Sequence, residues 1–288
     1  MAAVALATER ELDRLLPPSD GPLGRLGAAM RYATLGGGKR FRPLLVAATA
    51  ELGDADPAAV TRVGAAIEML HAYSLVHDDL PAMDDAKLRR GKPSCHVAFG
   101  EAEAILAGDA LLTLALEVLA RPDWPASAEL RCELALGLAR AGGWSGMCGG
   151  QLLDLADEGA DSPLDRIAYV EALKTGAIIA YACDAGARLA GLEPGARAAI
   201  AAYAADLGLA YQISDDLLDA LGDAAVTGKD SGIDAAAGKA TFVRALGIDG
   251  ARRRLAGLRE HGQAQLDFCG PEGRLLRELF DFVINRRV

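Results

Sequence analysis

The sequence has few of the residues that β-sheets, disulfide frameworks and zinc sites need. Aromatic residues make up only 5% of the chain while Ala and Leu dominate, so helix formers outweigh strand formers. The five cysteines are scattered, odd in number and without CxxC spacing, which indicates reduced thiols. We therefore expect an all-α fold that disulfides and zinc do not hold together.

A surplus of positive charge and a long uninterrupted apolar run are also missing. The net charge of -10 argues against nucleic acid or an anionic membrane as a partner. The longest apolar stretch, AILAGDALLTLALEVLA, is interrupted by Asp109, and MAAVALATERELDR has no basic segment typical of a signal peptide. We expect a cytoplasmic protein with no nucleic-acid partner and no stable membrane insertion.

Hydrophobic spacing of three and four residues predicts a series of helices. The pattern is clearest over residues 58–80, and further helices are expected over 43–52, 98–120, 127–148, 164–190, 196–221 and 274–286. No linker or shift in composition marks a boundary, so we expect a single domain over residues 1–288. Two segments, TLGGGKRFRP (34–43) and a Gly/Asp/Lys-rich stretch (222–241), are predicted to be functional loops.

Two acidic runs stand in otherwise apolar surroundings. In QISDDLLD (212–219), a helix places Gln212, Asp215, Asp216 and Asp219 within an arc of about 100°. In VHDDLPAMDD (76–85), Pro81 disfavours a continuous helix. If the Pro-Ala pair bulges out, Asp78, Asp79 and Asp84 converge as well.

Carboxylate clusters without His or Cys suit hard divalent cations, and Mg²⁺ prefers a few carboxylates together with phosphates. Each run taken alone could also be an acidic surface patch. Basic residues lie beside the acidic runs and the glycines, as an anionic ligand would require; they are Lys39, Arg40, Arg42, Arg89, Arg90, Lys174, Lys229 and Lys239.

Six strings, in this order, resemble the trans-isoprenyl diphosphate synthases, most closely the bacterial farnesyl diphosphate synthases. They are LGGGKRFRP, HAYSLVHDDLPAMDDAKLRRGKPSCH, GMCGGQLLDL, LKTGA, YQISDDLLD and GKDSGIDAAAGKATF. The resemblance runs from about residue 34 to residue 242 and also includes FVINRR near the end. It implies antiparallel helices around a deep central cavity, and a homodimer.

The resemblance also implies roles for individual residues. Both aspartate motifs would bind Mg²⁺ that bridges to an allylic diphosphate; they comprise Asp78, Asp79 and Asp84, and Asp215, Asp216 and Asp219. Isopentenyl diphosphate would be held by Lys39, Arg42, His71 and Arg90. The allylic substrate would contact Arg89, Lys174, Thr175, Gln212 and Lys229, with Lys239 as a further diphosphate ligand. Asp78, Asp79, Lys174, Thr175 and Gln212 would be catalytic, the last three by steadying the allylic cation.

Product length is expected to depend on the helix that precedes the first motif. Tyr73 lies five residues before Asp78, about 7 Å along a helix axis, where its ring could stop the growing chain while Ser74 leaves space. In the family, a bulky residue here and the Pro-Ala insertion accompany farnesyl diphosphate. The alternative for Tyr73 is plain helix packing. The product would be geranylgeranyl diphosphate if the ring turns aside, and geranyl diphosphate if other residues narrow the pocket.

The sequence differs from the family pattern at two places, and the family also includes a class of non-catalytic chains. GKATFV lacks a proline often found in the family, and Lys87 stands where an acidic residue is frequent. Neither departure involves a residue assigned to the metal; both concern how the loop closes. Some chains of this fold are non-catalytic regulatory subunits, but these typically lose an aspartate motif, and both motifs are complete here. A terpene cyclase would not need the GGGKRFRP and LRRG elements for a second diphosphate.

Overall fold

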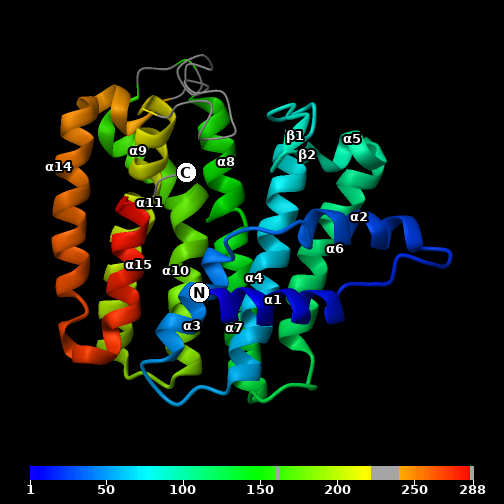
Figure 1. The fold of residues 1–288 in the computed structure, drawn as a ribbon, viewed down its shortest axis with the longest axis horizontal. Helices are drawn as coiled ribbons and strands as arrows, with labels where there is room; N and C mark the ends of the chain where they lie inside the picture. Colours follow the sequence, from blue (N-terminus) through cyan, green and yellow to red (C-terminus); the bar gives the residue numbers. More distant parts are fainter. Residues whose placement is uncertain (158, 160–161, 222–239, 286–288) are drawn as a thin grey trace. The chain divides into compact units, whose positions relative to one another are not determined.

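The computed structural model describes residues 1–157, 159, 162–221 and 240–285. Apart from turns and connections, this part of the chain is helical except for one short hairpin (Figure 1). The all-α prediction is confirmed. The first elements are α1 (Ala2–Leu15), α2 (Gly24–Thr34), α3 (Phe41–Ala50), α4 (Pro57–Asp78), β1 (Leu88–Arg89), β2 (Lys92–Pro93), α5 (Cys95–Phe99), α6 (Glu101–Ala120) and α7 (Ala128–Gly142). They are followed by α8 (Met147–Ala156), α9 (Leu164–Glu171), the π-helical turn η1 (Ala172–Gly176), α10 (Ala177–Leu189), α11 (Pro194–Leu221), α14 (Phe242–Ala264), the 3₁₀ segment η2 (Asp267–Gly273) and α15 (Arg274–Asn285). Among the helices described, none combines the length and the hydropathy that a membrane span requires.

Several helices differ from the sequence prediction. The structure adds α1, α2 and α14, for which no helix was predicted, and α3 begins at Phe41 inside the predicted loop. The predicted helix over 127–148 is interrupted by a turn between α7 and α8. Gly142, Gly143 and Gly146 explain the interruption, since glycine is a poor helix former.

Contacts divide the chain into two compact units. The first comprises Met1–Ala47 and Ala55–Leu138, and the second comprises Ala48–Asp54 and Ala139–Val288. The aspartates of the first motif belong to the first unit, and those of the second motif belong to the second. Whether the chain acts as the single domain expected from the sequence stays a prediction.

In the first unit, α4 is buried on almost every side because it packs against α1, α2 and α6 (Figure 1). Val63, Ile67 and Leu70 are fully buried in this core. The helix begins behind Asp56, whose carboxylate accepts a hydrogen bond of 2.7 Å from the Ala58 amide. It ends at Asp78, three residues before Pro81.

A buried ion pair joins the glycine-rich connection to α4. Arg40 is 4% exposed, has a positive φ of 45°, and donates a hydrogen bond of 2.6 Å to Glu68 Oε2 on α4. The same guanidinium also contacts Glu9 and the Thr34 carbonyl. Arg40 is therefore used to fix the GGGKR segment, which leaves its neighbours Lys39 and Arg42 as the candidates for ligand binding.

In the second unit, α11 packs against α10, α14 and α15 (Figure 1). Tyr203 on α11 is fully buried, stacks edge-on against Phe280, and donates a hydrogen bond of 2.7 Å to the Leu276 carbonyl. Ser214 on the same helix donates to the Val283 carbonyl at 2.9 Å. These bonds hold α15 along the helix that carries the second aspartate motif.

Candidate active site

The first aspartate motif lies in a tight turn at the end of α4. The Asp84 amide donates to the Asp78 carbonyl at 2.9 Å, and the Asp85 amide donates to the Leu80 carbonyl at 3.1 Å. Pro81 and Ala82 between them are exposed. The Pro-Ala pair therefore loops out as expected, and Asp84 is brought back beside Asp78.

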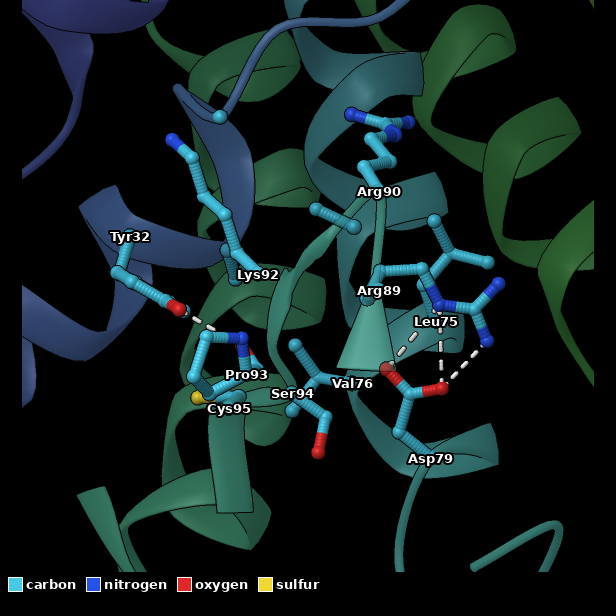
Figure 2. Close-up of a pocket in the computed structure, with 13 residues that line it drawn as sticks. Tyr32, Leu75, Val76, Asp79, Arg89, Arg90, Lys92, Pro93, Ser94 and Cys95 are labelled. Carbon is cyan, nitrogen blue, oxygen red and sulfur yellow. Dashed lines mark hydrogen bonds and ion pairs between the residues drawn. The ribbon is translucent and has the colours of Figure 1, made fainter. Parts of the chain in front are cut away.

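Asp79 is buried, unlike Asp78 and Asp84 of the same motif. Its side chain is almost completely buried, and both carboxylate oxygens accept hydrogen bonds from the Arg89 guanidinium on β1, at 3.1 and 3.2 Å from Nε and in a further contact from Nη2 (Figure 2). Burial alone would lower the pKa of Arg89, but Asp79, with the charges of Asp78 and Asp84, raises it above its ordinary value. Asp79 thus holds Arg89 in place, and its expected role as a metal ligand stays a prediction.

The hairpin that carries Arg89 turns through two residues with positive φ, Arg90 at 53° and Gly91 at 73°. Two left-handed residues form the tight turn that suits a two-residue hairpin, although an arginine rarely adopts this conformation. The Arg90 side chain points away from Asp79 (Figure 2). Its guanidinium contacts the Gly37 carbonyl of the glycine-rich connection. Arg90 is thereby brought to the segment that contains Lys39 and Arg42.

Positive charge accumulates around His71 on α4. Burial lowers the pKa of His71 well below its ordinary value, and the charges of Arg42, Arg90, Arg89 and Arg40 lower it further. His71 is therefore neutral at pH 7. Its Nδ1 atom and the Nε atom of Arg42 are buried, and neither has a hydrogen-bond partner among the described residues.

Such buried polar atoms are rare, because each lacks the hydrogen bonds that it would make with water. An anion can accept a hydrogen bond from Arg42 Nε, and its charge would relieve the mutual repulsion of the arginines. Three of the residues expected to hold isopentenyl diphosphate, namely Arg42, His71 and Arg90, are thus gathered in one neighbourhood. Lys39 is exposed on the adjoining connection.

The second aspartate motif lies on one face of α11, as the sequence predicts. Gln212 Nε2 donates to Asp216 Oδ1 at 3.1 Å, and the other oxygen of Asp216 accepts a hydrogen bond of 2.7 Å from the Phe242 amide. Phe242 is the first residue of α14, where the amide has no partner within the helix. The buried Asp216 therefore fixes the start of α14, whereas Asp215 and Asp219 remain partly exposed.

The π-helical turn η1 places Lys174 and Thr175 beside the second motif. A Cβ at Gly150 on α8 would overlap the Lys174 backbone, so the close approach of η1 to α8 requires glycine there. Lys174 Nζ donates a hydrogen bond of 2.6 Å to Asp154, and Thr175 Oγ1 lies 3.4 Å from Gln212 Oε1. Lys174, Thr175 and Gln212 are thus connected within the second unit.

Glu171 adjoins this group, 3.4 Å from Thr175 Oγ1. Burial raises its pKa to about 8; Lys174 opposes this rise, while Asp154 and Asp216 add to it. The carboxyl group is therefore mostly protonated at pH 7 and can donate a hydrogen bond. Sequence reasoning missed both Glu171 and Asp154, although Asp154 lies within the matched string GMCGGQLLDL.

The donor chemistry of the two motifs fits Mg²⁺. Asp78, Asp84, Asp215 and Asp219 offer oxygen donors of the kind that Mg²⁺ binds in combination with waters and phosphates. In the ranges that the structure describes, no three His, Cys, Asp or Glu side chains form a ready-made metal cage. Mg²⁺ does not require one, because it is usually held by one or two carboxylates plus substrate phosphates.

The remaining predicted residues fall into two groups. Lys229 and Lys239 lie outside the described residues. Tyr73 and Ser74 are buried on α4; the Ser74 hydroxyl donates to the His71 carbonyl at 2.9 Å, and the Tyr73 ring contacts His77.

Comparison with known proteins agrees with this geometry. The family model for polyprenyl synthetase matches residues 24–265. Farnesyl diphosphate synthase of Escherichia coli K12 is 45% identical over 89% of this chain and 88% of its own. An apo crystal structure described as an FPP/GFPP synthase from Zymomonas mobilis superposes with a TM-score of 0.90, at 44% identity, over 98% of this chain and 97% of its own.

A geranyltransferase from Helicobacter pylori, solved with magnesium and isoprenyl diphosphate, superposes with a TM-score of 0.85 at 30% identity, over 99% of this chain and 95% of its own. The family match covers more than half of the chain, and the relatives cover nearly all of it. The chain belongs to the polyprenyl synthetase family, and the resemblance inferred from its motifs is confirmed.

The ion pair between Asp79 and Arg89 generates a prediction. Asp79→Asn removes the charge that holds Arg89, so we expect the KM for the allylic diphosphate to rise about tenfold, since a hydrogen bond to a charged group contributes roughly 1.5 kcal/mol or more. The Mg²⁺ concentration for half-maximal rate should change little. Steady-state kinetics at varied Mg²⁺ measures both.

Asp85→Asn is the matched control, because the Asp85 side chain is exposed and its carboxylate contacts only the exposed Lys87 in the contacts described. Its kinetics should resemble those of the wild type. A marked rise in the Mg²⁺ requirement of Asp79→Asn, with an unchanged KM for the allylic diphosphate, would instead identify Asp79 as a metal ligand.

Proposed function

We propose that this chain is an Mg²⁺-dependent prenyltransferase that condenses isopentenyl diphosphate with dimethylallyl or geranyl diphosphate and releases farnesyl diphosphate. The observation that carries the proposal is the neighbourhood of His71 in the first unit. Arginine side chains surround a neutral histidine there, and the Nδ1 atom of His71 and the Nε atom of Arg42 are buried without partners. This arrangement suits a diphosphate.

The reaction needs the allylic C–O bond to break before the new carbon–carbon bond forms. Mg²⁺ bound by Asp78, Asp84, Asp215 and Asp219 would neutralise the charge that develops on the departing diphosphate. Arg89 is held in place by Asp79, and Lys174 is held in place by Asp154. Both cations would bind the allylic diphosphate and stabilise its negative charge. The double bond of isopentenyl diphosphate then attacks the allylic cation, and loss of a proton to the released diphosphate leaves the longer allylic product.

The neutral state of His71 suits its expected role. A neutral imidazole can donate one hydrogen bond to a phosphate oxygen without adding to the repulsion among the arginines around it. On the side of the allylic cation, the oxygens of Thr175 and Gln212 could stabilise positive charge. A mostly protonated Glu171 next to them limits the negative charge in this group.

Farnesyl diphosphate is the product we propose, since Tyr73 supplies bulk on α4 about 7 Å along the helix axis from Asp78. Geranylgeranyl and geranyl diphosphate are the alternatives. A non-catalytic regulatory subunit is disfavoured because both aspartate motifs are complete. We also propose a cytoplasmic homodimer; the exposed apolar side chains of Ile105 and Leu106 on α6 support a contact with a second copy.

The direct test is elongation by the purified protein. Incubation with isopentenyl diphosphate, either allylic starter and Mg²⁺ should give farnesyl diphosphate as the main product, as measured by chromatography of the dephosphorylated prenyl alcohols. Omission of Mg²⁺, or the Asp215→Asn substitution, should abolish most of the product. No elongation from any starter would overturn the proposal.

Tyr73 generates a separate prediction on product length. With isopentenyl diphosphate in excess, Tyr73→Ala should lengthen the main product by at least one five-carbon unit, because the bulky ring that we propose stops the growing chain is removed. Tyr73→Phe keeps the ring and is the matched control, so its main product should remain farnesyl diphosphate. The same product distribution from all three proteins would refute the role of Tyr73.

A further inference from the structure

His77 lies one helical turn beyond Tyr73 on α4, and the two rings are in contact. Their centroids are 5.0 Å apart and the planes meet at 78°, an edge-to-face arrangement. Residues four apart on a helix share a face, so this contact follows from the sequence spacing. Neither ring points in the same direction as Asp78: Tyr73 is rotated from it by about 140° and His77 by about 100° around the helix axis.

The His77 ring is fixed from its other side by α6. Its Nε2 atom lies 3.0 Å from the Ile105 carbonyl oxygen, which can only accept, so Nε2 is the nitrogen that donates. Gly108, one turn further along α6, leaves space for the ring, since any Cβ built there would overlap the imidazole. The nearest carboxylate, Asp109 Oδ1, is 3.9 Å from Nε2, beyond hydrogen-bond distance.

The orientation of Tyr73 therefore depends in part on a contact that α6 fixes. We infer that His77, seated against Gly108 and bonded to the Ile105 carbonyl, is a positioning residue that holds the Tyr73 ring where it limits the length of the product. The inference rests on the proposed function and extends it from Tyr73 to α6. An edge-to-face ring contact is strong enough to change the ratio of two ring orientations about two- to tenfold.

Two substitutions separate the ring contact from the bond to α6. His77→Gln can keep a hydrogen bond to the Ile105 carbonyl but removes the ring, whereas His77→Ala removes both. With geranyl diphosphate, excess isopentenyl diphosphate and Mg²⁺, both variants should raise the ratio of geranylgeranyl to farnesyl product about two- to tenfold over the wild type. Because the readout is a ratio, a general loss of activity does not change it.

Gly108→Ala tests the same contact from α6, without any change to α4. The added methyl group displaces the His77 ring, so the product ratio should shift in this variant too. Gly257→Ala on α14 is the matched control, because a Cβ there meets no other atom within 4 Å. Its product ratio should equal that of the wild type.

A double-mutant cycle decides whether His77 acts through Tyr73. If it does, adding His77→Ala to Tyr73→Ala should leave the product ratio of Tyr73→Ala unchanged. A wild-type product ratio from both His77→Gln and Gly108→Ala would overturn the inference, and so would fully additive effects in the cycle. Failure of the wild type to elongate any starter would instead refute the proposed function, so the two failures are distinguishable.

Discussion

Repulsion between adjacent carboxylates is the constraint on which both aspartate motifs depend. In two of the Asp-Asp pairs, Asp78-Asp79 and Asp215-Asp216, the second residue is buried and receives hydrogen bonds from the protein: Asp79 from Arg89, and Asp216 from Gln212 and the Phe242 amide. The first residue of each pair remains partly exposed. The buried carboxylates fix elements, namely the hairpin and the start of α14, while Asp78, Asp84, Asp215 and Asp219 are the ligands that we propose for the metal. The same residues that compensate the charge thereby shape the site.

The cationic side chains also differ in role: some stabilise the fold, and others are candidates for ligand binding. Arg40 is buried against Glu68 and fixes the glycine-rich connection, while Arg42 keeps a buried Nε without a partner in the described part of the chain. Lys174 is held by Asp154, and Arg89 is held by Asp79. Each of these three cations, Arg40, Lys174 and Arg89, thus has at least one carboxylate partner, which lowers the energetic cost of gathering positive charge before an anionic substrate binds.

The sequence predicted much of this arrangement because its strongest signals are local. Helical spacing placed the second motif on one face of α11, and Pro81 predicted the bulge that returns Asp84 to Asp78. The different roles of the two aspartates in the Asp78-Asp79 and Asp215-Asp216 pairs, and the position of His77 against Gly108, could not be predicted. Each depends on contacts between elements distant in the sequence, which hydrophobic periodicity does not report. The motifs were sufficient to predict the family. The contacts of Asp154 with Lys174 and of Glu171 with Thr175 were not predicted, because they depend on how η1 packs against α8 and α11.

The central claim, that the first aspartate of a pair serves the metal while the second serves the fold, is tested most directly in the second motif. Isothermal titration of Mg²⁺ with inorganic diphosphate into the wild type, Asp215→Asn and Asp216→Asn compares the two carboxylates without turnover. The account predicts that Asp215→Asn weakens Mg²⁺-dependent diphosphate binding about tenfold or more. Asp216→Asn should retain that binding but unfold at a lower temperature, because the start of α14 loses a charged acceptor. Equal loss of binding in both variants, with no change in the stability of Asp216→Asn, would contradict it.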